Sequence, residues 1–191
     1  MTTSAVFLDR DGVLSETDVR DGKPFAPTRF EDFRLIQETR PALIRLKQKG
    51  YLLVVVTNQP DVGNGLVARA TIERMNAALA RAVPVDAIKT CFHSQQEGCD
   101  CRKPEPGMIL EAAAEMHIDL ETSYLVGDRR GDIVAGARAG CTTIFINRGY
   151  REPSPDRPDF TVTSLTEAVD TILFNGRHAD RLEKDQSDDN N

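Results

Sequence analysis

The sequence predicts an α/β fold with a doubly wound, Rossmann-like parallel sheet. Segments with the pattern of a strand alternate with segments with the pattern of a helix, which is typical of a parallel sheet covered by helices on both faces. Leu52–Val56 is an uninterrupted aliphatic run, as expected for a strand buried on both faces. A length of 191 residues and a hydrophobic fraction of 40% suffice for one domain with an ordinary core.

The expected elements follow in order along the chain. Strands are expected at Ala5–Leu8, Leu52–Val56, Ala87–Phe92, Tyr124–Val126, Thr142–Ile146 and Phe160–Val162. Helices are expected at Pro41–Lys49, Ala70–Ala82, Gly107–Met116 and Ile133–Ala139, and a last helix opens with a capping box of Ser164 and Glu167.

The remaining segments are expected to be irregular. Glu16–Thr28 is polar and contains Gly22, Pro24 and Pro27, which predicts a loop or flap. No separate cap domain fits between the other elements, so residues 1–174 are expected to form a single domain. Residues 175–191 are polar and acidic, and we expect a disordered tail there.

The charge balance and the apolar runs exclude several classes of protein. A net charge of -6 and an isoelectric point near 5.1 argue against nucleic-acid binding, which needs a basic face. No apolar run is long enough to span a membrane, and none has the form of a signal peptide. We therefore expect a cytoplasmic protein and, without a coiled-coil pattern, a monomer. In that compartment we expect the four cysteines to be metal ligands or core residues rather than to form disulfides.

Polar residues follow the expected strands at the end where a parallel sheet binds its ligands. They are Asp9-Arg10-Asp11-Gly12, Thr57-Asn58-Gln59 and the segment Gly127-Asp128-Arg129-Arg130-Gly131-Asp132. Because the carboxyl ends of parallel strands meet at one edge of the sheet, these residues are expected to face one crevice.

The carboxylates in this crevice predict a cation. Asp9, Asp11 and Asp128 would repel one another unless a hard cation lay among them, and Mg²⁺ with oxygen ligands fits best. Lys103, with Arg102 or Arg129, would complete a site for an anion such as a phosphate. Taken alone, Asp9-Arg10-Asp11-Gly12 also fits an ordinary turn. That alternative weakens once Thr57 and Asp128 are placed at the ends of other strands.

Four residues with metal-binding side chains occur within a short segment. Cys91 and His93 are followed by Cys99 and Cys101, and three thiolates with one imidazole form the closed tetrahedral set of a structural Zn²⁺ site. The alternative is a core cysteine at a strand end with incidental neighbours. Since Cys101 directly precedes Arg102 and Lys103, zinc would fix the loop that carries the lysine.

The motifs together resemble the haloacid dehalogenase (HAD) superfamily of phosphatases. Phe7–Leu14 resembles the first motif of that superfamily, Thr57–Gln59 the second, Arg102–Pro104 the third and Gly127–Asp132 the fourth, in the order of the family. The resemblance implies an HAD-type fold and a Mg²⁺-dependent phosphomonoester hydrolase.

The resemblance also implies a role for each residue. Asp9 would attack phosphorus to form an aspartyl-phosphate, and Asp11 would act as general acid and then as general base. Asp9, the backbone carbonyl of Asp11, and Asp128 would hold Mg²⁺. The phosphate oxygens would be bound by Thr57, Asn58, Gln59, Arg102 and Lys103. Asp132 would contact a metal-bound water or orient its neighbours, and Arg129 is a further candidate beside it.

The zinc segment narrows the expected substrate to a small phosphorylated metabolite. It resembles the phosphatases that remove the 7-phosphate of D-glycero-D-manno-heptose 1,7-bisphosphate in lipopolysaccharide synthesis, and also those of histidinol phosphate. Arg102–Met108 favours the heptose group, whereas the short stretch between His93 and Cys99 favours the histidinol group. Two other classes remain: a phosphatase of nucleic-acid ends, which the acidic charge disfavours, and a non-catalytic zinc-binding module, which the presence of Asp9 and Asp11 disfavours.

Overall fold

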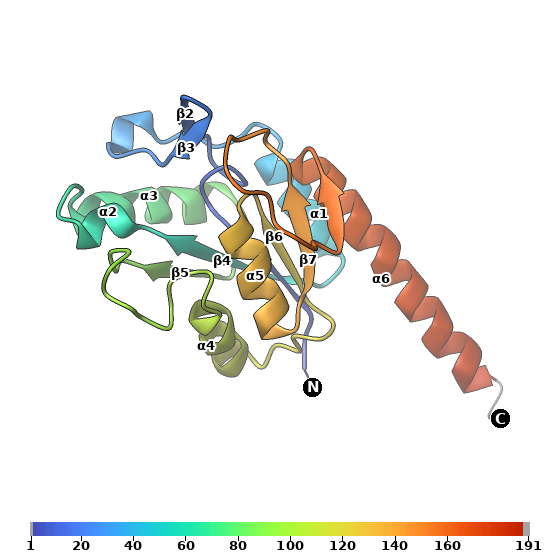
Figure 1. The fold of residues 1–191 in the computed structure, drawn as a ribbon. Helices are drawn as coiled ribbons and strands as arrows, with labels where there is room; N and C mark the ends of the chain where they lie inside the picture. Colours follow the sequence, from blue (N-terminus) through green and yellow to red (C-terminus); the bar gives the residue numbers. More distant parts are fainter. Residues whose placement is uncertain (1, 189–191) are drawn as a thin grey trace.

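The fold is built on one parallel sheet, as the sequence predicts. The computed structural model describes the backbone of residues 2–188 and the side chains of residues 2–176. Within that part, six parallel strands lie in the order β5-β4-β1-β6-β7-β8 (Figure 1). The strands are β1 (Ala5–Leu8), β4 (Leu52–Asn58), β5 (Ala87–Cys91), β6 (Tyr124–Gly127), β7 (Thr142–Ile146) and β8 (Phe160–Val162).

The order of the strands places a crevice at the end of β1. The chain adds β4 and β5 on one side of β1, and then returns to add β6, β7 and β8 on the other side. Leu8 is level with Val55 of β4 and with Val126 of β6, so Asp9, Thr57 and Asp128 lie near one edge of the sheet. A reversal of strand order is where doubly wound sheets bind ligands, at the carboxyl ends of the strands.

Helices cover both faces of the sheet (Figure 1). The main helices are α1 (Thr39–Gln48), α3 (Arg69–Ala82), α4 (Gly107–Met116), α5 (Arg130–Ala139) and α6 (Leu165–Asp188). In β1, Val6 and Leu8 pack with α1, α3 and α6, whereas Ala5 and Phe7 pack with α4 and α5. All four side chains are fully buried, and burial of one large aliphatic side chain stabilises the fold by about 1.5–3 kcal/mol. Strand β1, whose carboxyl end borders the crevice, is therefore packed on both faces.

The boundaries of several elements differ from those expected. Strand β4 extends through Asn58, because Thr57 and Asn58 pair with β5. Helix α5 begins at Arg130 rather than near Ile133, since the Asp132 carboxylate accepts the Arg129 N–H and caps the first turn. Two short elements add to those expected: the 3-10 helix η1 (Phe30–Asp32) and helix α2 (Pro60–Gly63).

The segment expected to be an irregular flap contains a β-hairpin. Strands β2 (Asp18–Arg20) and β3 (Lys23–Phe25) pair in antiparallel fashion. Asp21 and Gly22 form the two-residue turn, with φ angles of 50° and 78°. Left-handed backbone at both positions is typical of a type I′ turn, for which Asp-Gly is a preferred pair. The loop prediction was thus wrong for these strands, although the hairpin does border the crevice as a flap would.

Helix α6 opens with the expected cap. The Ser164 hydroxyl accepts the Glu167 N–H at 3.1 Å, and the Glu167 carboxylate accepts the Thr163 N–H at 2.8 Å, one residue earlier than in a standard capping box. The backbone stays helical beyond residue 175 and through Asp188. The rest of the expected tail lies outside the described residues, and its disorder stays a prediction. No helix in the described part of the chain combines the length and apolar character that a membrane span requires.

Candidate active site

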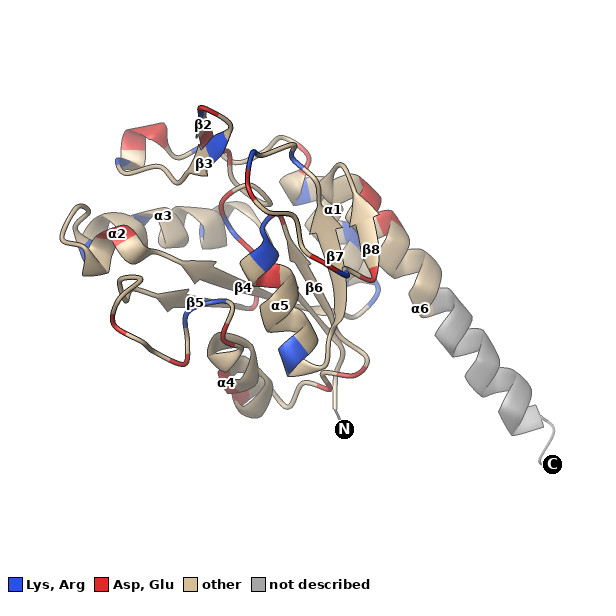
Figure 2. Cartoon of the chain, in the orientation of Figure 1, with Lys and Arg blue, Asp and Glu red and all other residues tan. Residues whose placement is uncertain are grey.

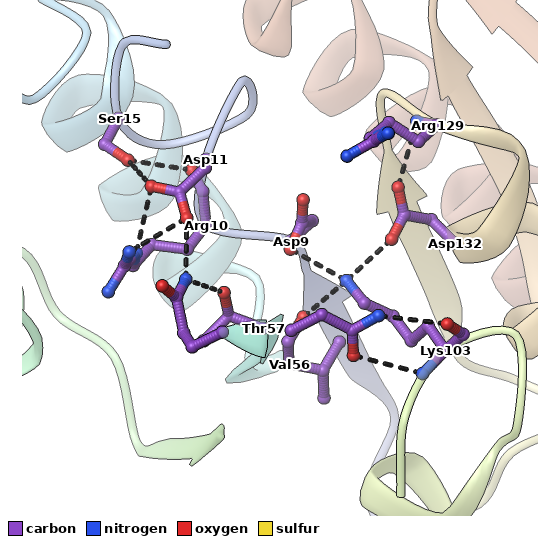
Figure 3. Close-up of polar contacts among 11 residues, drawn as sticks. Asp9, Arg10, Asp11, Ser15, Val56, Thr57, Lys103, Arg129 and Asp132 are labelled. Carbon is purple, nitrogen blue, oxygen red and sulfur yellow. Dashed lines mark hydrogen bonds and ion pairs between the residues drawn. The ribbon is translucent and has the colours of Figure 1, made fainter. Parts of the chain in front are cut away.

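Lys103 joins two carboxylates at the carboxyl edge of the sheet (Figure 3). Its Nζ lies 2.7 Å from Oδ1 of Asp9, which follows β1, and 2.6 Å from Oδ1 of Asp132 in α5. The same Nζ donates to the Val56 carbonyl of β4 at 2.7 Å. The segments after β1, β5 and β6, far apart in sequence, are thus joined through one ammonium group.

Burial and neighbouring charges have opposite effects on the pKa of Lys103, and partly opposite effects on the pKa of Asp9. Burial lowers the pKa of Lys103, but the carboxylates of Asp132 and Asp9 outweigh it and hold that pKa above its usual range. Burial raises the pKa of Asp9 from 3.8 to about 6, because the nearby Lys103 offsets only part of the desolvation and the charge of Asp132 adds to it. The lysine therefore stays charged at neutral pH, and the pKa of Asp9 lies closer to neutral pH than that of an ordinary carboxyl group.

Asp128 has the surroundings expected of a cation ligand. It is 2% exposed, and no group in the described part of the chain donates a well-formed hydrogen bond to either of its carboxylate oxygens. Burial raises its pKa well above 3.8, the charges of Asp9 and Asp132 raise it further, and the nearby Tyr150 hydroxyl offsets only part of the rise. Oxygens of Asp9, Asp128 and Asp132 lie within 4.8 Å of one another. Buried carboxylate oxygens in such a cluster fit a hard divalent cation such as Mg²⁺.

Asp11 points away from this cluster. Its carboxylate accepts hydrogen bonds from Arg10 at 2.8 and 3.1 Å, from Ser15 at 3.0 Å and from Gln59 at 2.8 Å (Figure 3). Arg10 is fully buried, and its Nη1 donates to Asn76 of α3 at 2.9 Å. Asp11 still lines the crevice, so its side chain is poised beside the cluster rather than within it.

The three residues at the end of β4 have different surroundings. Thr57 is buried and its hydroxyl accepts from the Gln59 amide at 2.9 Å. The same amide nitrogen donates to Asp11, so Gln59 links the two. The Asn58 side chain bonds the backbone of Lys103, donating to the carbonyl at 2.9 Å and accepting from the N–H at 3.1 Å. Two of the three side chains expected to bind substrate therefore also position their neighbours.

The two arginines expected near the anion site, Arg129 and Arg102, differ in their partners. Arg129 forms a bidentate ion pair with Glu152, at 2.6 and 2.9 Å. Among the residues that the structure describes, Arg102 has no ion-pair partner, and its Nη1 is buried without a hydrogen bond. Both line a cleft of about 810 Å³ that also contains Asp9, Thr57 and Lys103. That volume is in the range of small-molecule sites.

The predicted zinc ligands come together at the end of β5. Ligand atoms of Cys91, His93, Cys99 and Cys101 lie within 4.8 Å of one another, and the pairs in direct contact are 3.1–3.6 Å apart. Ligands at zinc bond lengths of about 2.0–2.3 Å would be separated by similar edges in a tetrahedron. Burial raises the pKa of Cys91, and the pKa of Cys101 is likewise raised, first by burial and then by its neighbouring thiols. The donor set fits a tetrahedral zinc site.

The loop after β7 contributes residues that sequence reasoning missed. Arg148 donates to the Gly12 carbonyl at 2.9 Å, and its Nη2 is buried with no hydrogen-bond partner within the described residues. The Tyr150 hydroxyl lies 3.2 Å from the Thr17 hydroxyl, beside Asp128 and Gly12. The available signal was position: the loop follows another strand of the same sheet and so emerges at the same edge.

The chain is similar to known phosphatases. Residues 100–168 match the family model described as HAD-hydrolase-like. The chain is 38% identical to the D-glycero-beta-D-manno-heptose-1,7-bisphosphate 7-phosphatase of Pasteurella multocida over 85% of this chain and 93% of that protein. It is 35% identical to the protein of the same name from Escherichia coli K12, over 88% and 93% of the two chains.

A solved structure shows the same fold. The crystal structure of the D,D-heptose 1,7-bisphosphate phosphatase from B. bronchiseptica, complexed with magnesium and phosphate, superimposes with a TM-score of 0.77 at 29% identity. The match covers 91% of this chain and 99% of that one. Extensive identity, a shared fold and the convergence of Asp9, Lys103 and Asp128 lead to one conclusion: the chain belongs to the HAD superfamily and is a phosphatase.

Proposed function

We propose that this phosphatase removes the 7-phosphate of D-glycero-beta-D-manno-heptose 1,7-bisphosphate with the aid of Mg²⁺. The observation that carries the reaction type is the meeting of Asp9 with Lys103 beside the buried carboxylate of Asp128. The substrate is supported by the names of the relatives that match most of the chain. The cleft between the hairpin and the sheet is large enough for a phosphorylated sugar.

Asp9 and Asp11 divide the chemistry in this proposal. An Asp9 oxygen attacks phosphorus, the bond from phosphorus to the sugar oxygen breaks, and Asp11 gives its proton to that oxygen. Asp11 then takes a proton from water, which attacks phosphorus and releases inorganic phosphate from Asp9. Asp11 must turn from its bonds with Arg10 and Gln59 to reach the sugar oxygen, and its place at the cleft wall permits this.

The remaining residues bind the metal ion or the phosphoryl oxygens, or orient the residues that do so. Asp9, the Asp11 backbone carbonyl and Asp128 would hold Mg²⁺, which when bound neutralises the negative charges that keep an anionic nucleophile from a phosphate. Thr57 and Lys103 would bind the phosphoryl oxygens, where charge lies in the transition state. Asp132 and Asn58 orient Lys103, through its ammonium group and its backbone respectively.

Zinc has a structural role in this proposal. Cys91, His93, Cys99 and Cys101 would complete its tetrahedron and leave no ligand position for water. Cys101 precedes Arg102 and Lys103 in the chain, so the metal would fix the loop that carries both cations. The protein would act in the cytoplasm as a monomer. A reducing compartment would suit the four cysteines, none of which forms a disulfide within the described residues.

A substrate panel tests the proposal. Phosphate release with Mg²⁺ is compared for the two anomers of the heptose bisphosphate, histidinol phosphate and a 3′-phosphorylated oligonucleotide. We expect the highest kcat/KM for the beta anomer. A preference for histidinol phosphate would refute the substrate. No release from any of them, nor from an aryl phosphate, would refute catalysis and favour a zinc-binding module.

A further inference from the structure

Arg10 carries a charge that lies inside the protein, just after the end of β1. Its side chain is fully buried. Figure 2 shows acidic and basic residues gathered around the end of β1 and the start of α5, at the edge of the sheet that carries the site. A buried charge costs free energy unless it is paired and its polar groups are hydrogen-bonded. The partners of this guanidinium group must therefore account for its presence.

Each nitrogen of the guanidinium group has a hydrogen-bond partner. Nε and Nη2 of Arg10 donate to the two carboxylate oxygens of Asp11 at 3.1 and 2.8 Å, and Nη1 donates to Oδ1 of Asn76 at 2.9 Å. The Cζ atom also lies over the ring of Phe33, 5.5 Å from the ring centroid. The guanidinium plane is therefore oriented from two sides, by Asp11 and by a residue of α3.

Asn76 joins Arg10 to the edge strand β5. Its Oδ1 accepts from Arg10, and its Nδ2 donates to Oγ1 of Thr90 at 3.0 Å. Arginine has only donors, so the amide oxygen must face it and the amide nitrogen must face Thr90. Thr90 in turn is paired with Thr57 of β4. A chain of hydrogen bonds therefore runs from β5 through Asn76 and Arg10 to Asp11.

The position of Asn76 indicates that it acts through its neighbours. The cleft lining includes Asp11, whereas within the described residues it includes neither Arg10 nor Asn76. Asn76 lies in the interior of α3, where asparagine is a poor helix former, so the local stability of the helix does not account for this residue. Its two tertiary hydrogen bonds are the contacts that remain to account for it.

We propose that Asn76 is a positioning residue for the general acid: it fixes the guanidinium group of Arg10, which in turn fixes the carboxylate of Asp11 at the cleft wall. This inference rests on the proposed function, in which Asp11 gives its proton to the sugar oxygen. Without the Asn76 amide, Nη1 of Arg10 loses its partner, and the buried group must move to find another. Asp11 is bound to that group through both oxygens, so its carboxylate moves too.

The leaving group of the substrate distinguishes this role from a structural one. A sugar oxygen is a poor leaving group and needs the proton of Asp11, whereas p-nitrophenolate leaves as a stable anion without a proton. The value of kcat/KM covers the steps up to departure of that group, and excludes the later hydrolysis of the phosphate on Asp9. A misplaced Asp11 should therefore lower kcat/KM for the sugar ester alone, whereas a loosened active site should lower it for both esters.

The test uses three variants of the hydrogen-bond chain and one control. Asn76→Leu keeps a side chain of similar shape that forms no hydrogen bond. Asn76→Asp keeps the acceptor for Arg10, because the Thr90 hydroxyl can donate to a carboxylate. Thr90→Val removes the hydroxyl that orients Asn76 and leaves the bond to Arg10. Ile72→Val is the matched control, because Ile72 is buried on α3 one turn before Asn76 and forms no part of the chain.

We expect the loss to fall on the heptose bisphosphate and not on p-nitrophenyl phosphate. Asn76→Leu should lower kcat/KM for the heptose about tenfold to thirtyfold, which is part of the factor of about 10²–10⁴ that a general acid contributes. For p-nitrophenyl phosphate the change should stay within about twofold. Thr90→Val should show the same pattern with a loss of about threefold. Asn76→Asp should recover most of the activity on the heptose, and Ile72→Val should leave the ratio of the two esters unchanged.

Several outcomes would overturn the inference while leaving the phosphatase intact. Values of kcat/KM that are unchanged, or equally lowered for both esters, in Asn76→Leu would show that this residue does not position the acid. A higher value for the heptose would show that Arg10 restrains Asp11 rather than places it. If Asn76→Leu does not fold, as judged by circular dichroism, Thr90→Val decides by the same comparison.

The unaltered protein separates this inference from the proposed function. Hydrolysis of p-nitrophenyl phosphate without hydrolysis of the heptose would refute the proposed substrate alone. Histidinol phosphate, which is also an alkyl ester, then takes the place of the heptose in the comparison. Release of phosphate from none of the three esters would refute the proposed function, and the role of Asn76 with it.

Discussion

Asn58 holds the backbone of Lys103 at both of its polar groups. The amide of Asn58 donates to the Lys103 carbonyl at 2.9 Å, and its oxygen accepts the Lys103 N–H at 3.1 Å. This pair of bonds joins the end of β4 to the loop after the zinc ligands, across a separation of 45 residues. The lysine that contacts Asp9 is thus aimed by a side chain that contacts neither charge.

Removal of this brace should impair catalysis more than stability. We expect Asn58→Ala to lower kcat about 10–100-fold, because a misplacement of about 1 Å at a reacting group can cost that much. The free energy of unfolding should fall by only about 1–2 kcal/mol. Steady-state kinetics and urea unfolding measure the two. Thr122→Ala, which removes an exposed bond to Ser4, is the control. An unchanged kcat in Asn58→Ala would show that these two hydrogen bonds do not position Lys103 for catalysis.

Asp128 should destabilise the protein when metal is absent. Burial raises its folded pKa well above the unfolded value near 3.8, so its stabilising contribution is present at low pH and is lost as pH rises through the folded pKa. The Asp128→Asn variant has no carboxyl group to ionise at this position, so it does not lose this stability as the pH rises. We expect the metal-free variant to be more stable than unaltered protein at pH 8, by on the order of 1–3 kcal/mol, with the difference shrinking toward pH 5.

The same variant should lose its response to magnesium. Saturating Mg²⁺ should raise the melting temperature of unaltered protein and leave Asp128→Asn unchanged, so the order of stability reverses. Thermal unfolding with and without Mg²⁺, at pH 5 to 8, measures both effects. A metal-free Asp128→Asn protein that is less stable than unaltered protein at pH 8 would show that the carboxylate has a partner in solution.

Local sequence predicts the strands, the helices and the edge where the site lies. Aliphatic runs such as Leu52–Val56 and the acidic residues that follow β1 and β6 are local signals, and topology then brings them together. The β2–β3 hairpin escaped prediction because its strands are short and Pro24 breaks the usual pattern. The Asp21-Gly22 pair was nevertheless a usable signal for its turn.

Partners of the site residues could not be predicted in the same way. The contacts of Asn58 with Lys103, and of Arg10 with Asn76, join residues 45 and 66 positions apart. No periodic pattern encodes such contacts, because they depend on side-chain rotamers fixed by the packed fold. The sequence therefore predicts the candidate reactive groups and names Asp132 as a residue that could orient its neighbours, but it does not predict which atoms Asp132 and Asn58 contact.

The cysteine cluster should be needed to keep Lys103 in place. Cys99→Ser should remove zinc and lower turnover, while the sheet stays folded, because the ligands end next to Arg102 and Lys103. Cys141→Ala is the matched control: this cysteine is buried outside the cluster and should leave the zinc content unchanged. Zinc content per chain, circular dichroism and kcat are the measurements. Full activity in zinc-free protein would refute the structural role.

A glycine should be required at position 12, because the Asp128 carboxylate occupies the space that a side chain there would need. Its φ of +88° strains any other residue, and a Cβ there would lie 1.8 Å from Oδ2 of Asp128. Gly50 has a φ of +87° and no atom within 4 Å of the place that a Cβ would take, so Gly50→Ala measures the backbone strain alone, about 1 kcal/mol. We expect Gly12→Ala to cost on the order of 3 kcal/mol or more and to weaken Mg²⁺ binding, which Gly50→Ala should not. Urea unfolding and titration with Mg²⁺ separate the two effects. Equal costs in the two variants would mean that the Asp128 carboxylate does not lie against Gly12.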